Sequence, residues 1–188
     1  MRVFLDFEAS SLHEDGYPIE VGWVFEDGRS EAHLIKPAPN WTDWDAGAQA
    51  LHKISRARLE AEGAAHDAVA RRLLEALGPH VVYASAPSWD GKWLSVLLRK
   101  AGLPRHAMRL KDSDEAHLEA AREILAPSIA PSRLDAAMAN AIQRARDEAG
   151  DEPTHRAVED AERERRIWLA VQRIAGEMAR EKGVSGGG

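Results

Sequence analysis

Residues 2–36 read RVFLDFEASSLHEDGYPIEVGWVFEDGRSEAHLIK, and this stretch decides the fold of the chain. The apolar and aromatic residues from Val3 to Phe7 are typical of a strand. A second strand is indicated over residues 19–26, where every second side chain is apolar: Ile19, Val21, Trp23 and Phe25. Asp27-Gly28 then forms a two-residue hairpin turn before a third strand over residues 30–36. The chain is therefore expected to begin as a β meander.

The rest of the sequence alternates between helical spacing and short apolar runs. Helical spacing predicts helices over residues 46–59, 64–77, 92–101, 114–125, 133–149 and 156–182. A short apolar run predicts a strand over residues 80–84, and a last short strand is expected over residues 108–111. Together these elements predict one α/β domain, residues 1–182, in which a mixed five-stranded sheet is flanked by helices. Residues 183–188 are expected to form a flexible tail.

Composition narrows the possible functions. No run approaches the roughly 18 to 20 apolar residues of a membrane helix, and the start turns acidic too early for a signal peptide, so we expect a soluble, cytoplasmic protein. The chain has no cysteine, which leaves oxygen and imidazole ligands for a metal and favours hard divalent cations. A net charge of −6 argues against a basic surface that coats nucleic acid. Carboxylates gathered around metal ions would still permit a phosphate substrate.

Two carboxylates stand at the end of the first predicted strand. Asp6 and Glu8 are two residues apart, so their side chains project from the same face. Adjacent like charges raise each other's pKa or require a counter-ion, and this pair can share one metal ion. In a chain this rich in acidic residues an Asp-x-Glu pair also arises by chance, but its position directly after Val-Phe-Leu strengthens the metal interpretation.

Three further residues are candidates for the functional site, although each could also be explained without a function. His155 and Asp160 open the last predicted helix. A histidine there is often solvated, but Val158 suggests that this turn is packed, and a buried aspartate needs a partner. Asp90 follows a strand at a helix start, where the helix dipole alone would stabilise it without any function.

In order and spacing, these residues resemble the motifs of the DEDDh 3′–5′ exonucleases of the ribonuclease H-like fold. This family contains the proofreading exonucleases of DNA polymerase III, ribonuclease T and oligoribonuclease. The resemblance runs from Val3 to about Trp168. The hairpin after the first motif and the segment Leu51-His-Lys-Ile-Ser55 support it.

The resemblance implies a role for each motif residue. Asp6, Glu8 and Asp160 would bind the first of two Mg²⁺ or Mn²⁺ ions, and Asp90 would hold the second, to which Asp6 bridges. His155 would be the general base for in-line hydrolysis of the terminal phosphodiester, releasing nucleoside 5′-monophosphates. The candidate substrate-binding residues are Phe7, Ala9, Leu12, His52, Lys53 and Trp89. The expected partners are 3′ ends of single-stranded RNA or DNA, with RNA slightly preferred, and a homodimer stays possible.

Some positions depart from the family pattern. Ser11 stands where many members carry Gly, and Ser85-Ala86 where they carry His-Asn. Two alternatives therefore stay open: a catalytically silent module that binds nucleic acid or a protein partner, and a helix-rich scaffold with accidental motif matches. Among nearby residues, Trp93 is expected in the core and Arg156 as a solvated charge.

Overall fold

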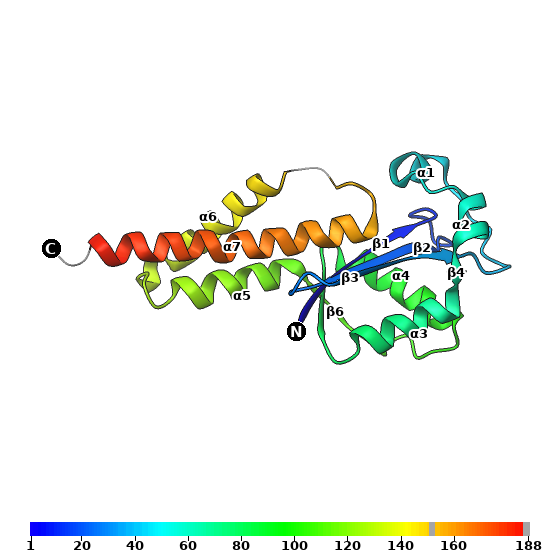
Figure 1. The fold of residues 1–188 in the computed structure, drawn as a ribbon, viewed down its shortest axis with the longest axis horizontal. Helices are drawn as coiled ribbons and strands as arrows, with labels where there is room; N and C mark the ends of the chain where they lie inside the picture. The colour runs from blue at the N-terminus through cyan, green and yellow to red at the C-terminus, as the bar shows by residue number, and fades with distance from the viewer. Residues whose placement is uncertain (151–152, 186–188) are drawn as a thin grey trace. The chain divides into compact units, whose positions relative to one another are not determined.

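The computed structural model describes residues 1–150 and 153–185 (Figure 1). Its strands are β1 (Arg2–Ala9), β2 (Pro18–Phe25), β3 (Ser30–Lys36), β4 (Ala64–Ala65), β5 (Val81–Ala84) and β6 (Leu110–Asp112). Its helices are α1 (Ala46–His52), α2 (Arg56–Glu62), α3 (His66–Leu77), α4 (Pro87–Lys100), α5 (Ser113–Leu125), α6 (Pro131–Ala149) and α7 (Ala157–Ser185). The chain divides into two compact units, the first formed by Met1–Lys111 with Pro153–Glu162.

The first unit is built on a mixed sheet with the strand order β4-β3-β2-β1-β5-β6. β2 pairs antiparallel with both β1 and β3, as the meander predicts, whereas β5 pairs parallel with β1. The sheet has six strands, so the predicted number of five was wrong. The additional strand, β4, has two residues and pairs with Ile35 and Lys36. Two residues are too few to show an alternating pattern, and the prediction placed them in a helix.

One face of the sheet carries the core of this unit. The alternate residues of β2 that the sequence marked as apolar, from Ile19 to Phe25, are buried together with Val3, Leu5 and Phe7 of β1. Helices α3 and α4 cover this face (Figure 1) and contribute Leu73, Leu77, Trp93 and Leu97 to the same cluster. Trp93 is thus in the core, as predicted.

The opposite face of β1 and β2 meets the start of α7. Asp6 and Gly22 are register partners in the β1–β2 ladder. The backbone of Ala157 and Val158 packs directly on Gly22, and a Cβ atom at Gly22 would lie 2.3 Å from Val158 N. Only glycine permits this approach, which brings the first turn of α7 onto the sheet beside Asp6.

Gly22→Ala is expected to lower the free energy of unfolding by about 2–3 kcal/mol, because the added methyl group collides with backbone atoms rather than with a flexible side chain. Urea unfolding followed by circular dichroism measures the change. Gly91→Ala in α4 is the matched control, since a Cβ there meets nothing within 4 Å. Equal stability of the two variants would contradict the close approach.

Several predicted boundaries were wrong, and local backbone geometry explains them. The helix predicted over residues 46–59 is two helices, because Lys53 adopts a left-handed conformation with φ 58° and Ser55 caps α2. Helix α4 begins five residues earlier than expected, with Pro87 in its first turn. Residues 183–185, predicted as flexible tail, continue α7, and residues 186–188 lie outside the described part of the chain.

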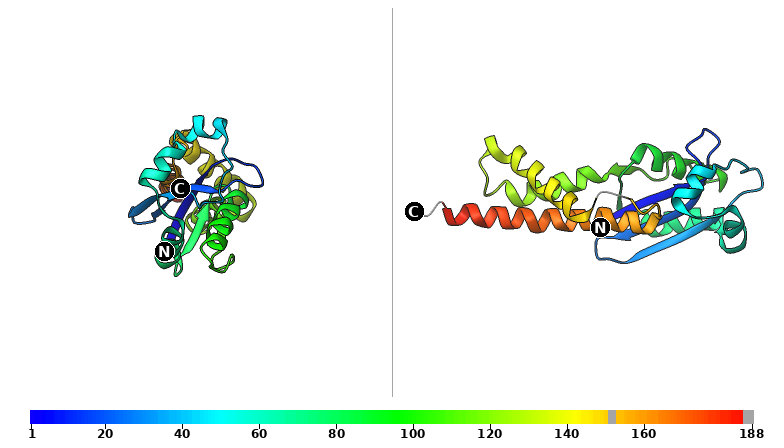
Figure 2. Two further views of the ribbon diagram at one scale, coloured as in Figure 1. Left: turned by 90° about the vertical axis from the view of Figure 1, so that its right-hand side faces the viewer. Right: turned by 90° about the horizontal axis from the view of Figure 1, so that it is seen from above.

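The second unit contains α5, α6 and the greater part of α7. Helices α5 and α6 pack through mostly small or aliphatic side chains, among them Ala121, Leu125, Ala141 and Ile142. Helix α7 is a single uninterrupted helix (Figure 2), whose residues 157–162 belong to the first unit. Among the described residues, no helix has both the length and the apolar character that crossing a membrane requires.

Candidate active site

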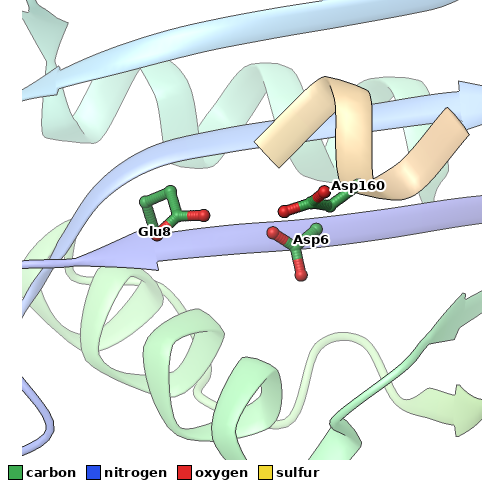
Figure 3. Close-up of side chains that lie close together, drawn as sticks. All are labelled: Asp6, Glu8 and Asp160. Carbon is green, nitrogen blue, oxygen red and sulfur yellow. The ribbon is translucent and has the colours of Figure 1, made fainter. Parts of the chain in front are cut away.

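Three carboxylates converge where β1 meets the start of α7. Asp6 and Glu8 project from the same face of β1, and Asp160 reaches them from α7 (Figure 3). Each residue offers one carboxylate oxygen, and these oxygens all lie within 4.8 Å of one another. We call Asp6, Glu8 and Asp160 the carboxylate cluster.

Hydrogen bonds from the chain just before α7 hold Asp160. Its Oδ1 accepts from the backbone N and the Oγ1 of Thr154, at 2.7 and 3.0 Å, and its Oδ2 accepts from the backbone N of His155 at 3.0 Å. His155 itself has φ 56°, a left-handed conformation that is uncommon for a residue with a Cβ. The sequence motif therefore forms a folded turn, in which the aspartate fixes the histidine that precedes it.

Asp90 lies beside the cluster on the first turn of α4. Its side chain is 3% exposed, and Oδ1 accepts from the backbone N of Phe7 at 3.2 Å. Its Oδ2 is buried and has no hydrogen-bond partner among the described residues. Burial raises the pKa of Asp90 to about 7, although the hydrogen bonds from Phe7 and Ala86 oppose the rise. A surface residue at a helix start, the plainer alternative, would not be buried in this way.

Glu8 is a second acid of the site whose pKa is strongly raised. Burial, followed by the charges of Asp160, Glu20 and Asp90, raises the pKa of Glu8 to about 8, while Arg156 opposes the rise. The site thus gathers carboxylate oxygens that could bind a metal, together with excess negative charge. The Oδ2 of Asp90, which accepts no hydrogen bond from the described residues, adds one more such oxygen. This donor set fits hard divalent cations such as Mg²⁺ or Mn²⁺, which would relieve the repulsion.

Without metal, the free energy of unfolding is expected to fall by several kcal/mol as the pH rises from 5 to 8. Between the ordinary carboxyl pKa and the raised values of Glu8 and Asp90, the native state holds protons that the unfolded chain has released. The stabilisation is therefore complete at low pH and is lost as the pH passes through the raised pKa values.

Urea unfolding in EDTA at pH 5, 6, 7 and 8 measures this dependence. Addition of Mn²⁺ should raise the melting temperature more at pH 8 than at pH 6, because the metal replaces the lost protons. A stability that stays level across this pH range in EDTA would refute the expectation.

A hollow of about 290 Å³ opens beside the carboxylate cluster. Its lining includes Asp6, Glu8, Asp90 and His155, together with five of the predicted substrate-binding residues: Phe7, Ala9, Leu12, His52 and Trp89. The sixth, Lys53, is not among the lining residues; it caps α1 with its backbone and its side chain is exposed. The structure thus brings together all the predicted metal and base residues and all but one of the substrate residues.

Apolar side chains form much of the rim of this hollow. Leu12, Leu51 and Trp89 are exposed although they are large and hydrophobic. The Trp89 ring stacks on Trp93 with 5.9 Å between centroids, and the Lys92 ammonium lies 5.3 Å from the Trp89 centroid. An exposed, braced indole beside charged groups can stack on a nucleobase.

His52 is held beneath this rim rather than on it. The residue is buried, and its Nδ1 accepts a hydrogen bond from the backbone N of Ile54 at 3.1 Å. Burial lowers the pKa of His52, so its imidazole is kept neutral. Because Nδ1 accepts this hydrogen bond, the neutral ring carries its proton on Nε2, so His52 can offer an N–H to a ligand but not a fixed charge.

Two segments around the site have hydrogen-bond or ion-pair partners that could not be predicted from the sequence. Asp43 accepts hydrogen bonds from Ser11 Oγ at 2.5 Å and Ser10 Oγ at 3.1 Å, and so ties the loop after β1. Although burial works against it, these bonds hold the pKa of Asp43 below its usual value. Arg156, expected to be solvated, forms an ion pair with Glu20 at 2.8 Å. Glu20 lies on the polar face of β2, and the alternating pattern was the only available signal for it.

Comparison with solved structures identifies proteins that share this fold. No family model matches the sequence, and no curated protein is similar to it. Among solved structures, the metal-free complex of E. coli exonuclease I with single-stranded DNA matches with a TM-score of 0.52 and 18% identity, over 67% of this chain and 30% of that one. Product-bound exonuclease I matches with a TM-score of 0.52 and 18% identity, over 67% of this chain and 32% of that one.

The zinc-bound complex of E. coli exonuclease I with single-stranded DNA gives the same values as the metal-free form: 18% identity, a TM-score of 0.52, 67% of this chain and 30% of that one. This chain therefore spans about a third of the length of these proteins. At this identity the similarity shows the fold, and it confirms the predicted α/β, ribonuclease H-like architecture of the exonucleases.

Proposed function

We propose that this protein is a metal-dependent 3′–5′ exonuclease that shortens single-stranded nucleic acid and releases nucleoside 5′-monophosphates. The observation that carries the proposal is the convergence of Asp6, Glu8 and Asp160 beside a hollow that His155 also lines. The fold shared with exonuclease I, which is known in complex with single-stranded DNA, supports it.

Each acidic residue has a place in this mechanism. Asp6, Glu8 and Asp160 would hold one divalent ion, and Asp90 together with Asp6 would hold a second. When bound, such ions lower the pKa of water and stabilise negative charge on the leaving oxygen. The buried Oδ2 of Asp90 and the raised pKa of Glu8 support these assignments, because both groups need a cation to balance them.

His155 would act as the general base. It would accept a proton from the water that attacks the terminal phosphodiester, the task that imidazole most often performs in enzymes. Its position at the edge of the hollow, on the turn that Asp160 fixes, supports this role.

The hollow would receive the last nucleotide of the strand. Its volume of about 290 Å³ is at the lower end of the range for ligand pockets, which suits one nucleotide rather than a duplex. Trp89 would stack on the terminal base and Leu12 would pack against it, contacts that tolerate every base. Lys53 does not line the hollow, and its contact with substrate stays a prediction.

The test is a time course with 5′-labelled single-stranded RNA and DNA of the same sequence, in Mg²⁺, Mn²⁺ or EDTA. We expect stepwise shortening from the 3′ end that requires the metal, and the faster ladder decides whether RNA is the preferred polymer. If neither strand shortens in any metal while the protein still binds them, the silent binding module replaces the exonuclease.

A further inference from the structure

A buried glutamate on β2 holds the chain on one side of His155. The Glu20 side chain is 2% exposed and lies on the same face of the sheet as Glu8, its register partner in β1. Arg156 donates to both carboxylate oxygens of Glu20, from Nη2 at 2.8 Å and from Nε at 3.1 Å. The backbone N of Ala157 donates to Glu20 Oε2 at 3.1 Å. A buried acid beside other acids needs such partners.

Glu20 binds Arg156 and Ala157, the two residues that come immediately after His155 in the chain. On the other side, Asp160 accepts hydrogen bonds from Thr154 and from His155 itself. Two carboxylates from different elements therefore fix the backbone before and after the histidine. Between them His155 keeps its left-handed conformation, which an unrestrained chain would leave.

The ion pair also limits what Arg156 can do. The guanidinium uses two of its nitrogens on Glu20, and the hydrogen bond raises the pKa of Arg156 above its already high value. A guanidinium held edge-on by a buried carboxylate serves that carboxylate rather than a phosphate group. Arg156 therefore stabilises the fold of residues 154–157 rather than binding a phosphate group.

We propose that Glu20 and Arg156 are positioning residues, which hold the backbone of residues 154–157 so that the His155 imidazole lines the hollow beside the carboxylate cluster. The inference rests on the proposed function for its catalytic consequence. Neither residue is assigned a contact with substrate, and both act through His155.

Glu20→Gln is the variant that isolates this role. Glutamine keeps the volume and one carbonyl oxygen for the N–H of Ala157, but it loses the charge that orients Arg156. The Arg156 side chain is 34% exposed, so it can turn to water when its partner is neutral. Arg156→Ala is less useful, because it would leave the buried Glu20 charge without a partner and destabilise the protein.

The matched control is Glu31→Gln. Glu31 of β3 forms a bidentate ion pair with Arg72 of α3, at 2.6 and 3.0 Å, and neither residue lines the hollow. The two variants thus remove the same charge from the same kind of pair at different places.

The experiment combines steady-state kinetics, Mn²⁺ titration and amide hydrogen exchange on the full chain. In Glu20→Gln we expect kcat to fall about 10- to 100-fold, as a small misplacement of a catalytic group does, with KM and Mn²⁺ affinity within about threefold of wild type. The amides of His155 and Ala157 should exchange faster. Glu31→Gln should leave kcat and these exchange rates unchanged.

Unchanged kcat or unchanged exchange in Glu20→Gln would overturn the inference. A loss of Mn²⁺ affinity without faster exchange would also overturn it, since Glu20 would then act on the metal ligands. If the wild-type protein hydrolyses neither polymer, the proposed exonuclease function is wrong, whatever the role of Glu20. Hydrogen exchange then decides whether Glu20 holds the His155 segment.

Discussion

Asp6→Asn is expected to lower the rate of 3′-end hydrolysis by about a thousandfold or more and to weaken Mn²⁺ binding severely. Asp6 is at the centre of the proposed site: it belongs to the carboxylate cluster and also lines the hollow. Asparagine has almost the same shape but carries no charge and offers one oxygen. The replacement should therefore leave the fold intact.

Isothermal titration with Mn²⁺ and the single-turnover rate on labelled oligonucleotide measure the two effects. Asp67→Asn is the matched control, because Asp67 lies in the first turn of α3 and pairs with Arg71 at the surface. If Asp6→Asn binds Mn²⁺ as tightly as wild type does, the carboxylate cluster is not a metal site and the motif matches are accidental.

The second large effect is expected for His155→Ala, which should lower the hydrolysis rate by about 10²- to 10⁴-fold, the usual contribution of a general base. Mn²⁺ affinity should stay within about threefold of wild type, because the metal is expected to bind the three carboxylates of the cluster and His155 is not one of them. This combination separates proton transfer from metal binding.

The comparison uses the same single-turnover assay and Mn²⁺ titration for both proteins. His106→Ala, which removes an exposed histidine outside the hollow, is the control for general effects of the substitution. If the His155→Ala protein is as active as wild type, His155 is not the general base, and the proposed metal site is unaffected by that result.

The parts of the fold that could be predicted from sequence are those with a local pattern. The alternation from Ile19 to Phe25 identified both the β2 strand and the face that packs on α3 and α4. The break between α1 and α2 had one local signal, the Ser55 that caps α2, but Lys53 takes its left-handed conformation without the Gly or Asn that usually marks one. The early start of α4 did have a signal, since proline is favoured in a first helical turn.

At the site, spacing along the chain predicted which residues lie together but not what holds them in place. Asp6 and Glu8 share a face by strand geometry alone, and motif order placed Asp160 with them. The burial of Glu20 depends on the packing of α7 against Gly22, a contact between segments far apart in sequence. Its polar position on β2 is therefore equally compatible with solvent, and only the folded arrangement distinguishes the two.

At position 155 the residue that would be best for stability differs from the one that the proposed activity requires, because the backbone there is left-handed. A side chain with a Cβ in this conformation costs about 1 kcal/mol or more, whereas glycine adopts it freely. Selection for thermal resistance alone would therefore tolerate or even favour glycine at position 155, and it would discard the proposed catalytic base. Laboratory evolution of a hardier form of this protein should accordingly screen for turnover at every round, with position 155 held fixed.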